Sequence, residues 1–139
     1  MNIRNKEGYM DTTAHDAIKA IERKAKLRFD YHPMVYICSP YAGDIELNVA
    51  NARRYSRHAV KKGYLPITPH LLYPQFLDDG LKSERDLGMF FGLVLMSKCA
   101  EVWVFGERIS TGMKMEIDRA RSKGYTIRFF SSSCEELRR

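Results

Sequence analysis

The chain has 139 residues, of which 45% are hydrophobic and 29% charged, which predicts one folded domain and excludes a disordered chain. Its longest apolar run, residues 88–96, is far too short to span a bilayer, and Met1–Lys6 lacks the apolar core of a signal peptide. We therefore expect a cytoplasmic protein with no membrane partner.

The net charge of +6 is spread along the chain. Arg53, Arg57 and Lys61 line one side of a predicted helix without interleaved aromatic residues, so a solvated face is favoured over a nucleic-acid site. The excess charge favours small anionic ligands instead. The three cysteines form no CxxC pair, which indicates reduced thiols. We expect no metal, because the histidines lack ligand spacing, and no cofactor, because Walker and GxGxxG motifs are absent.

Residues 1–32 are expected to form an N-terminal helical arm. Thr12 or Thr13 is suited to cap its helix. Apolar residues at helical spacing then form one stripe, made of Ala14, Ile18, Ile21 and Ala25. We expect this arm to pack on its own domain or on a neighbouring subunit. A membrane-surface role is disfavoured, because the stripe is thin and contains no Trp or Phe before Phe29.

Strands and helices alternate over residues 33–132. Strands are predicted at Met34–Cys38, Tyr64–Thr68, Val102–Phe105 and Thr126–Phe130. Helices are predicted between them, capped by Asp44, Ser83 and Ser110. This alternation is typical of a single doubly wound α/β domain of Rossmann or flavodoxin type, with about four to five parallel strands and helices on both faces. The polar tail at residues 133–139 is expected to fray.

The predicted helix at residues 84–98 is apolar on nearly every side. One face can be buried on the sheet, but the other requires a second partner. A homodimer or higher homo-oligomer is the economical explanation, and the arm at residues 1–32 is the competing cover.

One carboxylate stands on a helix face where a charge is not expected. In the helix after Ser110, the face expected to pack on the sheet carries Gly112, Met113, Glu116, Ile117 and Ala120. A carboxylate buried without partners is costly, so Glu116 is either paired or functional. Its position just beyond the carboxyl end of a strand is where open α/β folds bind their ligands.

Three loops are expected to converge at this edge of the sheet. They contribute Ser39, Pro40, Tyr41 and Gly43, then His70, then Ser110, Thr111 and Gly112. The last three stand at a helix N-terminus, which suits a phosphate, although a serine there is most often only a cap. Packing explains His70 better than a ligand role does, and an aromatic residue such as Tyr36 is ordinary in a strand. Asp86 is explained equally well by a functional role and by stabilising the first turn of its helix.

Three short blocks now resemble one known family, the nucleoside 2-deoxyribosyltransferase-like superfamily. They are Val35-Tyr36-Ile37-Cys38-Ser39-Pro40-Tyr41, Glu84-Arg85-Asp86-Leu87 and Ser110-Thr111-Gly112-Met113-Lys114-Met115-Glu116. The superfamily includes base-exchanging transferases and 2′-deoxynucleoside 5′-phosphate N-hydrolases. The Ser-Pro-Tyr and Pro-His-Leu sequences resemble most its small phage and bacterial members, which would act in a bacterial cytoplasm.

The resemblance implies a role for each matched residue. Glu116 matches the nucleophile, which attacks C1′ of the sugar and forms a covalent glycosyl ester. Tyr36 matches a tyrosine that orients this carboxylate, and Asp86 an aspartate that assists protonation of the leaving base. Ser39, Ser110 and Gly112 match contacts to a 5′-phosphate.

The position six residues before Glu116 bears on the substrate. Transferases of free nucleosides often carry an acid there, whereas this chain has Ser110, as do the hydrolases that accept a phosphate. We therefore predict an N-glycoside hydrolase acting on a (deoxy)nucleoside 5′-monophosphate. The alternatives are a non-catalytic nucleotide-binding or sequestering module, a 2-deoxyribosyltransferase, and a structural protein in which Glu116 only pairs with a lysine or arginine.

Overall fold

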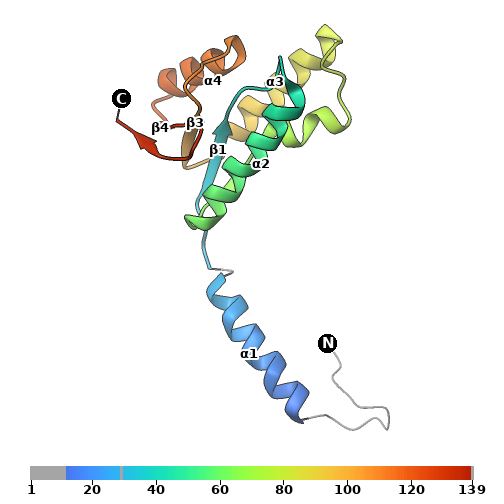
Figure 1. Ribbon diagram of the computed structural model, residues 1–139, viewed down its shortest axis with the longest axis vertical. Coiled ribbons are helices and arrows are strands. Elements are labelled where there is room, and N and C mark those ends of the chain that lie inside the picture. The colour runs from blue at the N-terminus through green and yellow to red at the C-terminus, as the bar shows by residue number, and fades with distance from the viewer. Residues whose placement is uncertain (1–11, 29, 139) are drawn as a thin grey trace. The chain divides into compact units, whose positions relative to one another are not determined.

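The computed structural model describes residues 12–28 and 30–138, and the chain divides into two compact units, residues 1–32 and 33–139. In the first unit the predicted helix is present as α1, Thr12–Arg28 (Figure 1). Thr12 and Thr13 are both inside this helix, so its cap lies outside the described residues. Within the apolar stripe, Ile21 is 63% exposed, and the side chain of Ala25 is outside the described part.

The second unit is built on one five-stranded sheet with the order β2-β1-β3-β4-β5. Its strands are β1 Met34–Cys38, β2 Leu65–Ile67, β3 Glu101–Phe105, β4 Thr126–Phe130 and β5 Glu136–Leu137. The first four are parallel to one another, and β5 is antiparallel to β4. The doubly wound α/β fold predicted from the strand–helix alternation is confirmed.

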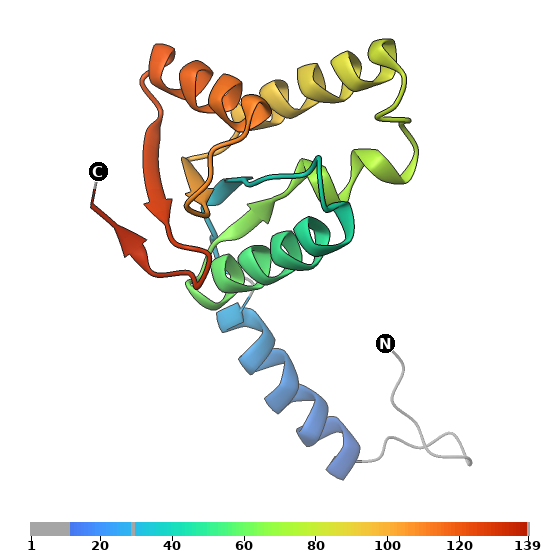
Figure 2. The same cartoon turned by 45° about the horizontal axis from the view of Figure 1, so that its top comes forward.

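Helices cover both faces of the sheet, with α3 and α4 on one side and α2 on the other (Figure 2). These helices are α2 Ile45–Lys61, α3 Lys82–Met96 and α4 Thr111–Ser122, and two short 3-10 turns, η1 Pro69–Leu71 and η2 Tyr73–Gln75, precede α3. The sheet is buried on both sides because side chains alternate along each strand. Thus Tyr36 and Val102 join the core beneath α3 and α4, whereas Val35 and Trp103 join the core on the side of α2.

The strand register brings the carboxyl ends of the central strands to one edge. Cys38 at the end of β1 pairs with Val104 of β3, and Tyr36 pairs with Ile67 at the end of β2. The loops that follow β1, β2 and β3 therefore leave the sheet at the same edge, as predicted.

Two of the three helix caps predicted within residues 33–132 are confirmed. The Asp44 carboxylate accepts from the Leu47 N–H at 3.1 Å, and the Ser110 hydroxyl accepts from the Met113 N–H at 3.2 Å. The Ser83 cap is wrong, because α3 already begins at Lys82 and its first turn contains Ser83. Leu81 stands at the cap position without a side-chain hydrogen bond.

The polar tail is more ordered than expected. Residues 136–137 form β5 against Phe129 and Phe130, so fraying is wrong for this part of the tail. The turn that reverses the chain is closed by a hydrogen bond from the Ser131 N–H to the Glu135 carbonyl at 2.8 Å, with Cys134 at φ 65°. A hairpin of this kind is hard to see in the sequence, because its turn residue is a cysteine rather than glycine or asparagine.

One face of α3 is buried and the other is exposed and apolar. Gly92 and Met96 are buried against the rest of the domain, whereas Leu87, Phe90 and Val94 are 41%, 59% and 43% exposed. No helix in the described part of the chain is long and apolar enough to cross a bilayer.

Candidate active site

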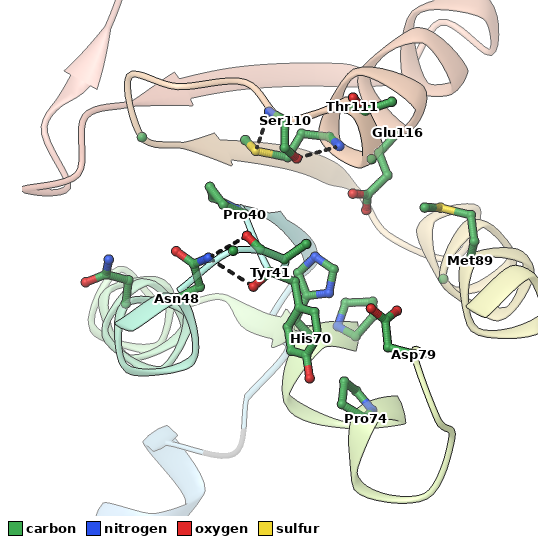
Figure 3. Close-up of a pocket in the computed structure, with 18 of the residues that line it drawn as sticks. Pro40, Tyr41, Asn48, His70, Pro74, Asp79, Met89, Ser110, Thr111 and Glu116 are labelled. Carbon is green, nitrogen blue, oxygen red and sulfur yellow. Dashed lines mark hydrogen bonds between the residues drawn. The ribbon is translucent and has the colours of Figure 1, made fainter. Parts of the chain in front are cut away.

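A cavity of about 890 Å³ opens at the carboxyl edge of the sheet. The loop after β1, the first turns of α2, the turns η1 and η2, one face of α3, and the loop and first turns of α4 form its walls. Figure 3 shows the Glu116 carboxylate pointing into this space from α4, with Met89 of α3 nearby and Tyr41 and His70 on another wall.

Glu116 is 3% exposed, so the sequence correctly placed this carboxylate on the buried face of its helix. The Tyr36 hydroxyl donates a hydrogen bond to Oε2 of Glu116, and the Cys38 thiol lies 3.8 Å from Oε1. Among the residues that the structure describes, no lysine or arginine forms an ion pair with Glu116. The alternative in which this glutamate only pairs with a cation is therefore wrong for the described chain.

Burial and hydrogen bonding act in opposite directions on this group. Desolvation raises the pKa of Glu116 to about 7, and it outweighs the hydrogen bonds from Tyr36 and Cys38, which lower the pKa. Burial and the neighbouring carboxylate raise the pKa values of Tyr36 and Cys38 well above their usual range, so both remain protonated donors. The pKa of this carboxyl group therefore lies well above that of an ordinary glutamate, as is frequent at functional sites.

The loop after β1 forms an aromatic wall. The rings of Tyr41 and His70 stack with their centroids 5.1 Å apart, and the Asn48 amide holds the loop by donating to the Tyr41 carbonyl at 2.9 Å. Burial lowers the pKa of His70, although the Ser39 backbone and Asp79 act in the opposite direction. His70 is thus both a packing residue and part of the cavity wall.

Most of the predicted binding residues line the cavity. These are Pro40, Tyr41, Gly43, His70, Ser110, Thr111 and Gly112, together with the predicted catalytic residues Tyr36 and Glu116. Ser39 comes directly after the buried end of β1. It is 1% exposed and does not line the cavity. Its hydroxyl has no hydrogen-bond partner among the described residues.

The structure does not bring Asp86 into the site. Its carboxylate pairs with Lys82 at 2.7 Å, and its side chain is 60% exposed. Since α3 begins at Lys82, Asp86 lies in the second turn, one turn after that lysine, and the acid in the first turn is Glu84. Both the catalytic and the first-turn explanations of Asp86 are corrected by this placement.

Several residues on the cavity wall were not singled out from the sequence. Arg85, Gly88, Met89 and Gly92 line it at helical spacing from α3, and Arg108 lines it from the loop before α4. The signal for the α3 group is the i, i+3, i+4, i+7 spacing after Arg85. Cys38 was missed as a partner of Glu116, although it shares a strand face with Tyr36, two residues earlier. In the described ranges, no cluster of three or more His, Cys, Asp or Glu side chains could hold a metal ion.

Comparison with solved structures supports the fold. A 2-deoxyribosyltransferase from the psychrotolerant bacterium Bacillus psychrosaccharolyticus is similar with a TM-score of 0.56 and 18% sequence identity, over 76% of this chain and 77% of the other. No curated protein matches the chain. At this identity the likeness concerns the fold. The family model described as "Domain of unknown function (DUF7768)" matches residues 33–130, which include every strand and helix that lines the cavity, and the chain belongs to this family.

Proposed function

We propose that the protein is an N-glycoside hydrolase that cleaves the base–sugar bond of a (deoxy)nucleoside 5′-monophosphate, with Glu116 as nucleophile. One observation carries the proposal: a buried carboxylate that faces a cavity, has no cationic partner among the described residues, and accepts a hydrogen bond from a protonated tyrosine. A carboxyl group whose pKa is raised to about 7 by burial does not stabilise the fold when ionised, so a purely structural role does not explain why Glu116 faces the cavity.

In the proposed reaction, a carboxylate oxygen of Glu116 attacks C1′ of the sugar. A C1′–O ester bond forms while the C1′–N bond breaks, and its electron pair departs on the base, which takes a proton from water. A second water molecule then attacks C1′ of the ester, gives up a proton to solvent, and restores the carboxylate. Tyr36 orients Glu116 throughout through its hydrogen bond to Oε2.

Two cationic side chains on the cavity wall can contact a monophosphate, although the acidic residues Asp44, Asp79, Glu84 and Glu107 line the same wall. Arg85 and Arg108 are both exposed and line the cavity, and α4 presents the N–H groups of its first turn beside Ser110. The stacked rings of Tyr41 and His70 offer an apolar wall for the base. Asp86 has no part in this proposal, because it lies outside the cavity.

The test is to incubate the protein with a panel of ribo- and deoxyribonucleoside 5′-monophosphates and to detect free base by chromatography. We expect base release by the parent and a loss of at least about a thousandfold in Glu116→Gln, since the amide is no nucleophile. Asp118→Asn is the matched control, because Asp118 lies on the exposed side of the same helix, and it should keep the parent rate. Equal rates in parent and Glu116→Gln would contradict the proposal.

Two alternative functions predict different outcomes with the same ligands. A binding module would release no base, yet a monophosphate would raise the melting temperature of both the parent and Glu116→Gln. A 2-deoxyribosyltransferase, the activity named for the similar solved structure, would form a new nucleoside when a second free base is added.

We also propose that the protein forms a homo-oligomer through the exposed face of α3. From Leu87 to Ser97 this helix contains no charged residue, so two copies can pack on each other here without burying a charge. Contiguous exposed apolar residues of this kind mark interaction surfaces, and a twofold contact needs a face that is complementary to itself.

A further inference from the structure

Two glycines four residues apart on α3, Gly88 and Gly92, line the cavity. Both lie inside the helix, where glycine is disfavoured relative to alanine because it loses more backbone freedom on folding. Each position therefore calls for a reason why the side chain is absent.

The space around the two glycines differs. A Cβ atom at Gly92 would lie 3.0 Å from the Tyr36 hydroxyl oxygen and 3.7 Å from Cγ of Pro69. A Cβ atom at Gly88 would lie 3.5 Å from Cδ1 of Leu77, which is an ordinary van der Waals contact. Of these two positions, Gly92 is the crowded one, and the atom that crowds it is the donor to Glu116.

Tyr36 has little room to yield to an added methyl group. Its side chain is 2% exposed, it stands on the inner strand β1 between β2 and β3, and its rigid ring turns about only two bonds. Its hydroxyl already contacts the Glu116 carboxylate, so a methyl group at position 92 requires the hydroxyl or α3 to shift by a few tenths of an ångström, which disturbs this hydrogen bond.

We propose that Gly92 is a positioning residue, whose missing side chain reserves the space in which the Tyr36 hydroxyl meets the Glu116 carboxylate. Gly92 acts through Tyr36 and not on the substrate. The consequence for catalysis rests on the proposed function of Glu116, whereas the consequence for the Tyr36–Glu116 hydrogen bond does not.

The first experiment titrates the Glu116 carboxyl group by carbon-13 NMR in the parent, Gly92→Ala and Gly88→Ala, with Glu116→Gln to assign the signal. The hydrogen bond from Tyr36 lowers the pKa of Glu116, so its weakening in Gly92→Ala should move the midpoint upward by roughly one pH unit. Gly88→Ala should leave the midpoint unchanged. The titratable groups that act on this carboxyl are Tyr36 and Cys38, with Cys99 near Tyr36, and neither glycine substitution replaces any of these side chains. An unchanged midpoint in Gly92→Ala would overturn the proposal.

The second experiment repeats Gly92→Ala in a Tyr36→Phe background, where no hydroxyl remains to be displaced. We expect no further movement of the Glu116 midpoint, because the two changes act on one hydrogen bond. An additive movement would show that Gly92 acts by another route, against the proposal. If Gly92→Ala alone does not fold, the double variant should fold, since the 3.0 Å contact is gone, and its failure to fold would also count against the proposal.

These outcomes separate the two proposals. If the parent releases no base, the proposed hydrolase activity is wrong, but the titration midpoints of Glu116 still test the role of Gly92. An unmoved midpoint in an active parent would overturn the role of Gly92 alone.

Discussion

Glu116 faces the core from its helix, and one side of its carboxylate remains open to a cavity. Its partners are neutral donors rather than cations, so they orient the carboxylate without neutralising it. Burial then keeps its pKa at about 7, well above that of an ordinary glutamate. Because the raised pKa makes the ionisation of Glu116 depend on pH near neutrality, pH is the natural variable for testing the proposed nucleophile.

The pH dependence of kcat/KM for base release should follow Glu116 in the free enzyme. Because only the ionised carboxylate attacks, the rate should rise with pH through about 7 and level off above it. Tyr36→Phe removes a hydrogen bond that lowers this pKa, so the rising limb should move to higher pH and the plateau should fall. A limb that stays in place in Tyr36→Phe would show that another group controls the rate.

At the scale of elements, the parts of the site that could be predicted from the sequence are those with a periodic signal. The buried face of α4 identifies Glu116, and the strand–helix alternation places three loops at one edge. The first-turn role of Asp86 was misjudged because α3 begins two residues earlier than predicted, and its site role, implied by the resemblance, fails because of the way α3 packs. With the start at Lys82, it is Arg85 and Met89 that line the cavity, and Asp86 does not.

Other features depend on contacts between segments distant in sequence, which no local pattern reveals. The contact of Tyr36 with Glu116 was implied by the family resemblance, whereas the Cys38 thiol on the same strand, 78 positions from Glu116, carried no such signal. The contact between position 92 and the Tyr36 hydroxyl arises only when α3 packs over β1, so the sequence alone does not predict it. The strand β5 likewise pairs through backbone groups, in a tail whose side chains are mostly polar.

The exposed face of α3 can be tested by charge. Phe90→Glu places a carboxylate in the middle of this face, at a side chain that is 59% exposed, and should dissociate the proposed oligomer into single chains. Val60→Glu is the matched control, because Val60 is 58% exposed on α2. Sedimentation velocity measures the outcome. A parent that already sediments as a single chain, or equal effects of the two changes, would rule out this interface.

At the scale of the whole molecule, the unit of residues 33–139 contains both hydrophobic cores and every residue that lines the cavity. The same sheet face that provides the core beneath α4 also surrounds the Glu116 carboxylate. Ionising this carboxyl group places a charge in a buried site, which costs free energy. The proposed nucleophile should therefore lower the free energy of unfolding of the whole domain.

The sign of this effect follows from the pKa values of the two states. The pKa of Glu116 is about 7 when folded and near 4.5 when unfolded, so the folded state holds its proton more tightly. This contribution to stability is fully present below about pH 4.5 and is lost as the pH rises to about 7, a loss of about 3 kcal/mol. Glu116→Gln removes the titration. We therefore expect the stability of the variant relative to the parent, measured by urea unfolding, to increase by about that amount from pH 4.5 to pH 8. A difference that does not change with pH would mean that Glu116 is ionised at little cost, and would remove the physical basis for assigning it the role of a tuned nucleophile.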